Sequence, residues 1–193
     1  MKRFVISLFF SLLLIDVYGN DCNCDFTLTK DEWKYDGEEM GVFPGAIICI
    51  ESGNRRQLHL SNFKGSPDKP LTFINCNGKV TISGKGTYGF KTRACQYFRV
   101  TGTGSKGIEY GIEIKDRNQG MQLEYGSSDF ELDHLEIHHI GFAGIMAKTD
   151  PTCDPATWRE NFTMRNVSIH HNYIHHTDRG EALYIGNSFY ENG

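Results

Sequence analysis

The chain has 193 residues and a formal net charge of −4 at neutral pH. This small charge is not gathered into basic clusters, which argues against nucleic acid as a partner. After the first segment, roughly 170 residues remain, enough for one domain with an apolar core.

The first segment, residues 1–19, has the order of a secretory signal peptide. Lys2 and Arg3 give a positive start, an apolar run extends from Phe4 to Ile15, and Val17 and Gly19 fit the small-residue positions of a cleavage site. The apolar run is too short to span a bilayer, and no later stretch is long and apolar enough. We therefore predict a protein that is secreted, either extracellular or on the cell surface, monomeric and without a membrane span.

Six cysteines, at positions 22, 24, 49, 76, 95 and 153, suit an oxidising compartment. Their spacing matches no zinc pattern, so disulfides are expected without an assigned pairing. Buried free thiols are the alternative for Cys49, Cys76 and Cys95, which lie on expected strands.

Residues 20–41 are expected to form an N-terminal capping segment. Thr29 and Glu32 have the spacing of a capping box, which predicts a short helix running through Trp33. Residues 42–193 differ, because runs of four to six residues rich in Ile, Val, Phe and Thr alternate with Gly, Asn and Asp. Such runs predict short β-strands separated by turns.

The expected strands repeat along the chain. Phe98, Phe130 and Phe162 lie 32 residues apart, and the pair His138-His139 has the same offset from His170-His171. A second series, Gly-apolar-x-apolar, starts at Gly89, Gly120 and Gly144 and in altered form at Ala182, at intervals of 31, 24 and 38. Repeats of this length indicate a solenoid in which equivalent side chains stack in columns. The hairpin signals of a β-propeller are missing.

The stretch "FPGAIICIESGNRRQLHLSNFKGSPDKPLTFINCNGKVTISG" resembles the first coils of right-handed parallel β-helix proteins of the pectate-lyase-like superfamily. Gly45-Ala-Ile-Ile and Pro70-Leu-Thr-Phe stand where those proteins have Gly-Asp-Thr-Ile and Pro-Ile-Thr-Ile. The resemblance extends over about residues 42–193. It implies an all-β fold, a right-handed parallel β-helix of about four coils. "SFYENG" is typical of the turn into another coil, so further coils are expected after Gly193.

In this fold the Gly-apolar-x-apolar strands form part of the binding cleft. Alternation sends one set of residues inward: Phe90, Thr92, Met121, Leu123, Ile145, Ala147, Leu183 and Ile185. The other set faces outward: Lys91, Arg93, Gln122, Glu124, Met146, Lys148 and Tyr184. Arg93 and Tyr184 are candidates for binding an acidic sugar, through a cation for its carboxylate and an aromatic face for its ring. An ordinary solvated face has the same composition.

Charged residues near the expected strand ends are the candidates for catalysis. Lys148 and Arg179 are candidate bases for removing the proton beside a uronate carboxylate. Glu124, Asp178 and Glu181 are candidate ligands of Ca²⁺, which prefers several oxygen atoms. Charged turn residues that are simply solvated are the alternative.

Two further features have a structural and a functional interpretation. The loop of residues 149–161 holds Trp158, either a sugar platform at a cleft wall or a side chain packed on the domain. Seven of the eight histidines lie between positions 134 and 176. We interpret them mainly as part of the solenoid wall, with Val167, Ile169 and Ile174 inward and Asn172 at a bend, and metal binding as the alternative.

Two functions follow from the resemblance. The first is a lyase that cleaves an acidic polysaccharide by β-elimination. The second is a non-catalytic protein that binds polysaccharide or a cell-surface glycan. The Arg-x-Pro-x-x-Arg pattern of pectate lyases is absent, as are the Asp-Asp and Gly-His-Gly motifs of polygalacturonases.

Overall fold

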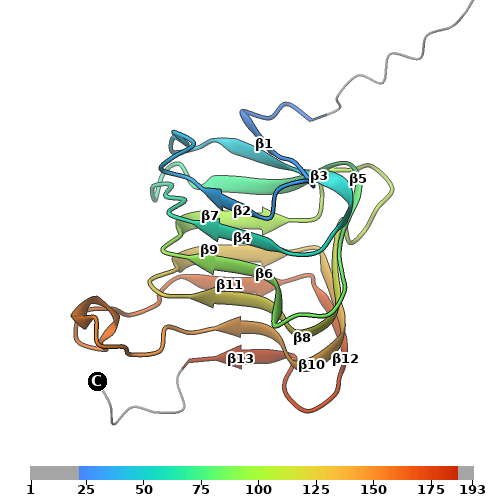
Figure 1. Cartoon of the computed structure of the whole chain (residues 1–193). Coiled ribbons are helices and arrows are strands. Elements are labelled where there is room, and N and C mark those ends of the chain that lie inside the picture. The colour runs from blue at the N-terminus through green and yellow to red at the C-terminus, as the bar shows by residue number, and fades with distance from the viewer. Residues whose placement is uncertain (1–21, 187–193) are drawn as a thin grey trace, which may run out of the picture.

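The computed structural model of the chain describes residues 22–186, which form an all-β domain with a large parallel sheet (Figure 1). The predicted signal peptide and the "SFYENG" segment, apart from its neighbour Gly186, lie outside the described residues. Within these residues the one helical element is a 3-10 turn, η1 (Pro155–Thr157), and no helix is long and apolar enough to cross a membrane.

The strands form three stacks in which every pair between named strands is parallel. Stack A contains β1 (Phe26–Leu28), the first halves of β3 (Ile47–Arg55) and β5 (Leu71–Ile82), β7 (Gln96–Thr101), β9 (Ser128–Asp133) and β11 (Val167–His170). Stack B contains the second halves of β3 and β5, the first halves of β8 (Ile112–Glu124) and β10 (Leu135–Ala147), and β12 (Tyr173–Thr177). Stack C contains β2 (Lys34–Asp36), β4 (Leu58–Ser61), β6 (Tyr88–Arg93), the second halves of β8 and β10, and β13 (Leu183–Ile185).

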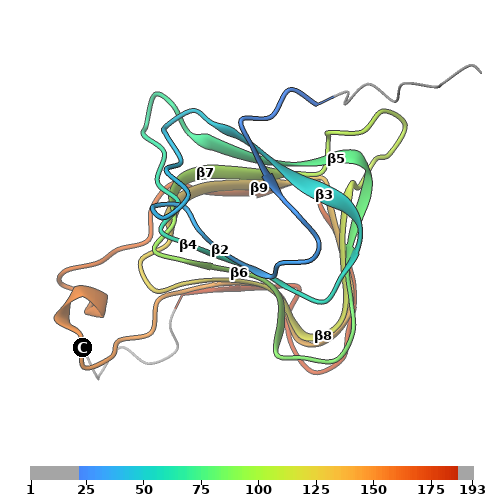
Figure 2. The ribbon, with the colours of Figure 1, turned by 45° about the horizontal axis from the view of Figure 1, so that its top comes forward.

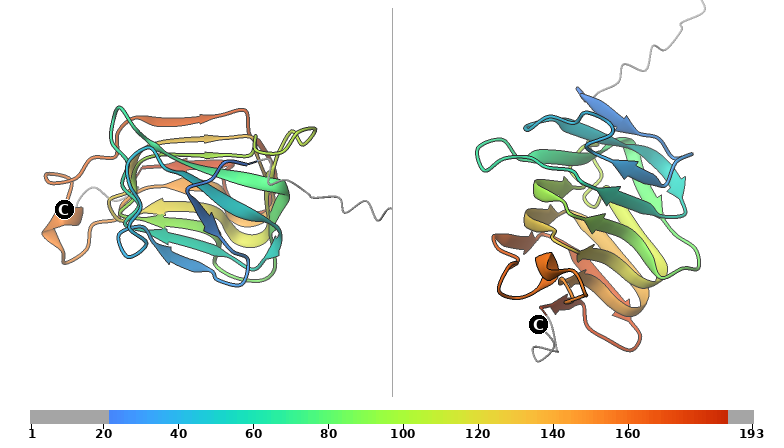
Figure 3. Two further views of the ribbon diagram at one scale, coloured as in Figure 1. Left: turned by 90° about the horizontal axis from the view of Figure 1, so that it is seen from above. Right: turned by 60° about the vertical axis from the view of Figure 1, so that its left-hand side comes forward.

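The chain passes from stack A to stack B to stack C and then returns to stack A one layer further on. Figure 2 shows β7 and β9 on one side of the interior and β4 and β6 on the opposite side. The two views of Figure 3 show the same layers, with the segment around η1 projecting from one side. This arrangement is compatible with a solenoid.

Aromatic side chains fill the interior between the stacks. The rings of Phe63 and Phe73 lie 5.1 Å apart, those of Phe73 and Phe98 6.2 Å, and those of Phe98 and Phe130 5.5 Å. All four side chains are buried. Phe98 and Phe130 are register partners, as the 32-residue repeat predicts.

The 32-residue repeat fails in the next layer. Val167, not Phe162, pairs with Phe130, because residues 148–166 form a long connection that adds five residues to the spacing. Phe162 lies on that connection, half-buried. The histidine offset fails for the same reason: His138 pairs with His175, while His170 pairs with Asp133.

The Gly-apolar-x-apolar series is confirmed strand by strand. Phe90 pairs with Met121, Met121 with Ile145, and Ile145 with Leu183. The residues expected to face inward are buried as far as Ala147. Leu183 and Ile185 keep the register but remain 43% and 54% exposed, because no described strand lies beyond β13.

Two expectations for the first part of the chain have different outcomes. The helix predicted from Thr29 through Trp33 is wrong, because these residues form a turn that leads directly into β2, and pairing with β4 holds this strand. Disulfides are present between Cys22 and Cys76 and between Cys24 and Cys49. Cys95 is a buried free thiol, and Cys153 is free and exposed.

Bends between the stacks use residues with a positive φ. Asp116, His139 and His176 occupy one such bend in consecutive layers, with φ between 51° and 57° at each. Asp and His tolerate this conformation better than most side chains. Asn172 lies at a neighbouring bend, where its amide bonds to the backbone of Leu135 and Leu132, as predicted.

Candidate functional site

The outer face of stack C carries aligned polar and aromatic side chains from six strands. Alternation along each strand buries every second residue and turns the others outward. The register places two rows across the layers: Lys34, His59, Lys91, Gln122, Met146 and Tyr184 in one, and Asp36, Ser61, Arg93 and Glu124 in the other. Side chains far apart in the sequence thus become neighbours on one surface.

His59 is the group on this face whose protonation is most strongly perturbed. Burial, together with the charges of Lys91, Lys34 and Arg93, lowers the pKa of His59 to about 4. Its ring lies 6.4 Å from that of Trp33 and 6.1 Å, edge-on, from that of Tyr88. At neutral pH His59 is therefore an uncharged imidazole among three cations, and it can accept a proton.

Tyr88 lies beside His59 and has the opposite chemical character. Burial, and then the charge of Glu124, raise the pKa of the Tyr88 hydroxyl. Tyr88 therefore remains protonated and can donate a proton. The Lys91 ammonium lies 5.1 Å from the centre of the Tyr88 ring and forms an ion pair with Glu124.

Aromatic surface accompanies the cations at both ends of this face. The Arg93 guanidinium lies 3.9 Å from the centre of the Tyr125 ring. Trp33, at the other end, is 46% exposed, which leaves a large part of its indole available to a ligand. Trp33 also borders a hollow of about 360 Å³ together with Lys30, Asp31, Arg56 and Gln57. Trp33 thus links His59 to this hollow.

Four of the residues singled out from the sequence lie on this same face: Arg93, Glu124, Lys148 and Tyr184. The Lys148 ammonium forms a 2.9 Å ion pair with Asp150 and lies 5.2 Å from the centre of the Tyr184 ring. Arg93 and Glu124 are register partners.

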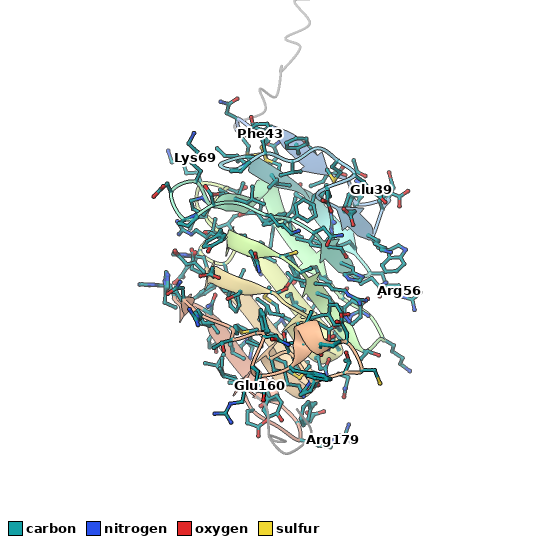
Figure 4. All side chains as sticks on the ribbon, turned by 90° about the vertical axis from the view of Figure 1, so that its left-hand side faces the viewer. Glu39, Phe43, Arg56, Lys69, Glu160 and Arg179 are labelled. Atoms are coloured by element: carbon teal, nitrogen blue, oxygen red, sulfur yellow. A yellow bond between two sulfur atoms is a disulfide. The ribbon has the colours of Figure 1, made fainter. Side chains whose placement is uncertain are left out.

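Asp178, Arg179 and Glu181 lie apart from those four residues. They belong to the turn from β12 to β13, where the Arg179 amide donates to Gly141 and the Asp178 amide to Ile140. Lys148 follows the opposite end of the paired strand. In Figure 4 Arg179 lies at the far end of the stacked layers from Arg56, which borders the hollow. The structure therefore does not bring Arg179 to Lys148, or Asp178 and Glu181 to Glu124.

Trp158 lies half-buried on the connection between β10 and β11. Its indole N–H donates to the Thr152 carbonyl at 2.8 Å, so the ring is held by its own loop. The loop is tied to stack C by a 2.8 Å hydrogen bond from the Tyr125 hydroxyl to Asp154. It thus flanks Tyr125, against which Arg93 packs.

Two sets of possible metal ligands converge on the outer faces of the other stacks: Glu113, Glu136 and His138 in stack B, and Glu131, Asp133 and His170 in stack A. Cations of the chain already occupy both. Lys79 lies 2.8 Å from Glu136, Lys115 3.1 Å from Glu113, and Arg99 2.7 Å from Asp133. Burial alone would raise the pKa of Glu113, but bonds from His138, Lys115 and Thr81 hold it at about 2.

The sequence analysis did not identify His59, Tyr88 and Trp33 as site residues. The strand "LHLS" does carry a signal, because Leu58 and Leu60 are buried and alternation turns His59 outward. Its neighbours Tyr88 and Lys91 come from the next layer, about 30 residues later. The cluster therefore appears only when the layers are placed in register.

Comparison with known proteins adds no relative. No family model matches the chain, and neither a curated protein nor a solved structure matches it.

Proposed function

We propose that this chain is a secreted right-handed parallel β-helix protein, similar to the pectate-lyase-like superfamily, whose stack C face binds acidic polysaccharide. The three parallel stacks and their layers support the fold, and the layers outnumber the four coils expected from sequence. The two disulfides support an oxidising, extracellular location. The resemblance of residues 42–193 to that superfamily supports a carbohydrate ligand.

The observation that carries the proposal is an uncharged His59 surrounded by Lys34, Lys91 and Arg93. Cations of this kind pair with the carboxylates of a uronate chain. Trp33 and Tyr125 offer apolar faces to sugar rings. An extended polymer matches a face whose residues repeat from layer to layer about 4.8 Å apart.

We further propose that the face cleaves the polymer by β-elimination. The His59 imidazole accepts the proton from the carbon beside the uronate carboxylate, while Lys91 and Arg93 stabilise the charge that develops on that carboxylate. A carbon–carbon double bond forms as the bond to the leaving glycosidic oxygen breaks. The Tyr88 hydroxyl gives a proton to that oxygen. No added oxidant or co-reactant is needed.

Ca²⁺ has no role in these steps. The sequence-predicted ligands Glu124, Asp178 and Glu181 do not fit one ion, because Glu124 pairs with Lys91 and the other two belong to a different end of the strands. The assay below still includes Ca²⁺, so that a dependence on the ion is detected.

The test follows the ultraviolet absorbance of the unsaturated product with a panel of uronate polymers, with and without Ca²⁺. We expect His59→Ala to lower the rate by about 10²- to 10⁴-fold, and Lys91→Met with Arg93→Met to weaken binding. Because His59 must be uncharged, the activity of the free protein should persist at pH 6 and fall as the pH approaches 4. Lys148→Ala tests the base expected from sequence.

The outcomes separate the alternatives. Loss of turnover in Lys148→Ala with an active His59→Ala variant would move the base to the other end of the face. Binding without turnover on any polymer would support the non-catalytic, glycan-binding function. Absence of both binding and turnover across the panel would contradict the proposal itself.

A further inference from the structure

Three pairs of consecutive histidines make the same set of contacts, at bends outside stack C. The first histidine of each pair points its Nε2 at a glutamate one layer earlier, and its Nδ1 contacts the Nδ1 of the second histidine. The three sets are Glu113–His138–His139 at 3.1 and 2.6 Å, Glu131–His170–His171 at 3.1 and 2.7 Å, and Glu136–His175–His176 at 3.7 and 2.5 Å.

This arrangement fixes where the protons lie in an uncharged pair. Glu113 is ionised, since its pKa is held at about 2, so it accepts a hydrogen bond from His138 Nε2–H. The His138 Nδ1 is then an acceptor, and His139 must donate its own Nδ1–H to it. The remaining nitrogen of His139, Nε2, carries a lone pair. His139 is exposed, and none of the described residues bonds to this Nε2.

His176 repeats this position one layer later. The His139 and His176 rings stack with their centres 4.9 Å apart and their planes 4° from parallel. Both residues are exposed and both occupy the positive-φ bend. Asp116 occupies the same bend one layer before His139, since its neighbours Lys115 and Arg117 pair with His138 and Ile140. One exposed column thus offers a carboxylate and two imidazoles.

We propose that Asp116, His139 and His176 form a binding site for a divalent transition-metal ion such as Zn²⁺ or Cu²⁺. Imidazole nitrogens and a carboxylate are ligands that these ions accept. Two nitrogens about 2.0–2.1 Å from one ion lie roughly 3.4–4.2 Å apart. The stacked rings therefore have to tilt toward each other by less than about 1 Å each, which exposed side chains at a bend allow. The glutamate–histidine pairs behind them orient the rings and increase their basicity.

The other histidine column differs in ways that disfavour a metal. His134 and His171 stack at 5.6 Å, which is farther apart, and Gly102 precedes them in that column instead of a carboxylate. The convergent carboxylates Glu113 and Glu136 already bind Lys79 and Lys115. The column of Asp116, His139 and His176 is thus the place where nitrogen lone pairs and a carboxylate face solvent together.

The test is calorimetric titration of the untagged, disulfide-bonded protein with ZnCl₂, together with electron paramagnetic resonance of the Cu²⁺ complex. We expect one equivalent of Zn²⁺ per chain, and a Cu²⁺ spectrum with coupling to two imidazole nitrogens. His139→Ala and His176→Ala should each weaken binding at least about 10-fold and remove one nitrogen coupling. Glu113→Gln, which removes no ligand, should weaken binding by roughly 10-fold. Ca²⁺ should not compete.

His171→Ala is the matched control, because it deletes a histidine held by the same contacts in the other column. It should leave the stoichiometry, the affinity and the spectrum unchanged. Equal weakening by His171→Ala and His139→Ala would mean unspecific binding to surface histidines and would overturn the proposal. So would an absence of Zn²⁺ binding, provided that circular dichroism shows the protein to be folded. Neither outcome depends on polysaccharide cleavage.

Discussion

Phe98→Ala is expected to lower the free energy of unfolding by about 3–5 kcal/mol. The Phe98 ring packs between Phe73 and Phe130, one layer to each side, and is only 2% exposed. Truncation therefore removes contacts to two layers at once and leaves a cavity that the stacked backbone cannot close. Chemical denaturation followed by circular dichroism measures the change.

Phe43→Ala is the matched control, since the same side chain is removed from a position that is 50% exposed. It should change the free energy of unfolding by less than about 1 kcal/mol. Equal losses in the two variants would show that Phe98 is not enclosed between layers.

Asp133→Ala is expected to cost about 2–3 kcal/mol at pH 7. The Asp133 carboxylate is fully buried and accepts hydrogen bonds from Arg99 and Thr101, each at 2.7 Å, and contacts His134 at 2.6 Å. Burial alone would raise its pKa, but these three partners outweigh burial and lower the pKa to about 2. The carboxylate thus stabilises the fold in its ionised form.

The pH dependence of this contribution follows from the direction of the shift. The folded pKa of Asp133 lies below its ordinary value of 3.8, so the unfolded chain binds the proton more readily. The contribution is fully present above pH 4 and disappears as the pH falls toward 2. Denaturation at pH 7, 4 and 2.5 should show the difference between the natural protein and Asp133→Ala shrinking. Asp150→Ala, which removes an exposed ion pair with Lys148, should have little effect at any pH. A difference for Asp133→Ala that does not change with pH would contradict this account.

The strand alignment of stack C could be predicted because each of its strands keeps the same local pattern. A small residue precedes alternating apolar residues at Gly89, Gly120 and Gly144. The Gly120 and Gly144 positions lie so close to the next layer that a Cβ there would approach a backbone oxygen to 2.4 and 2.6 Å. Such a constraint marks the position whatever the length of the connecting loops.

The alignment of stack A was predicted only in part, because it depended on a constant spacing. The interval from Phe98 to Phe130 is 32 residues, but the connection before β11 makes the next interval 37. A phenylalanine on that connection, Phe162, imitates the repeat. Nothing in the local sequence distinguishes it from a strand residue.

The candidate site was harder to predict than the fold. Arg93 and Tyr184 could be placed on the outer face by alternation alone. The state of His59 could not, because the charges that lower its pKa come from Lys34, Lys91 and Arg93 on two other strands. Such a property belongs to the contacts between layers and has no local sequence motif.

Disulfide trapping between layers tests the register most directly. Glu131 and Ser168 are register partners in β9 and β11, so their Cα atoms are expected to lie within the range that a disulfide can bridge. With Cys153 replaced by serine, the Glu131→Cys, Ser168→Cys variant should form a new cross-link in the folded state, located by peptide mapping. The 32-residue repeat would instead pair Glu131 with Thr163. A cross-link in the Glu131→Cys, Thr163→Cys variant, and none in the other, would contradict the stacked register on which the fold and both proposed sites depend.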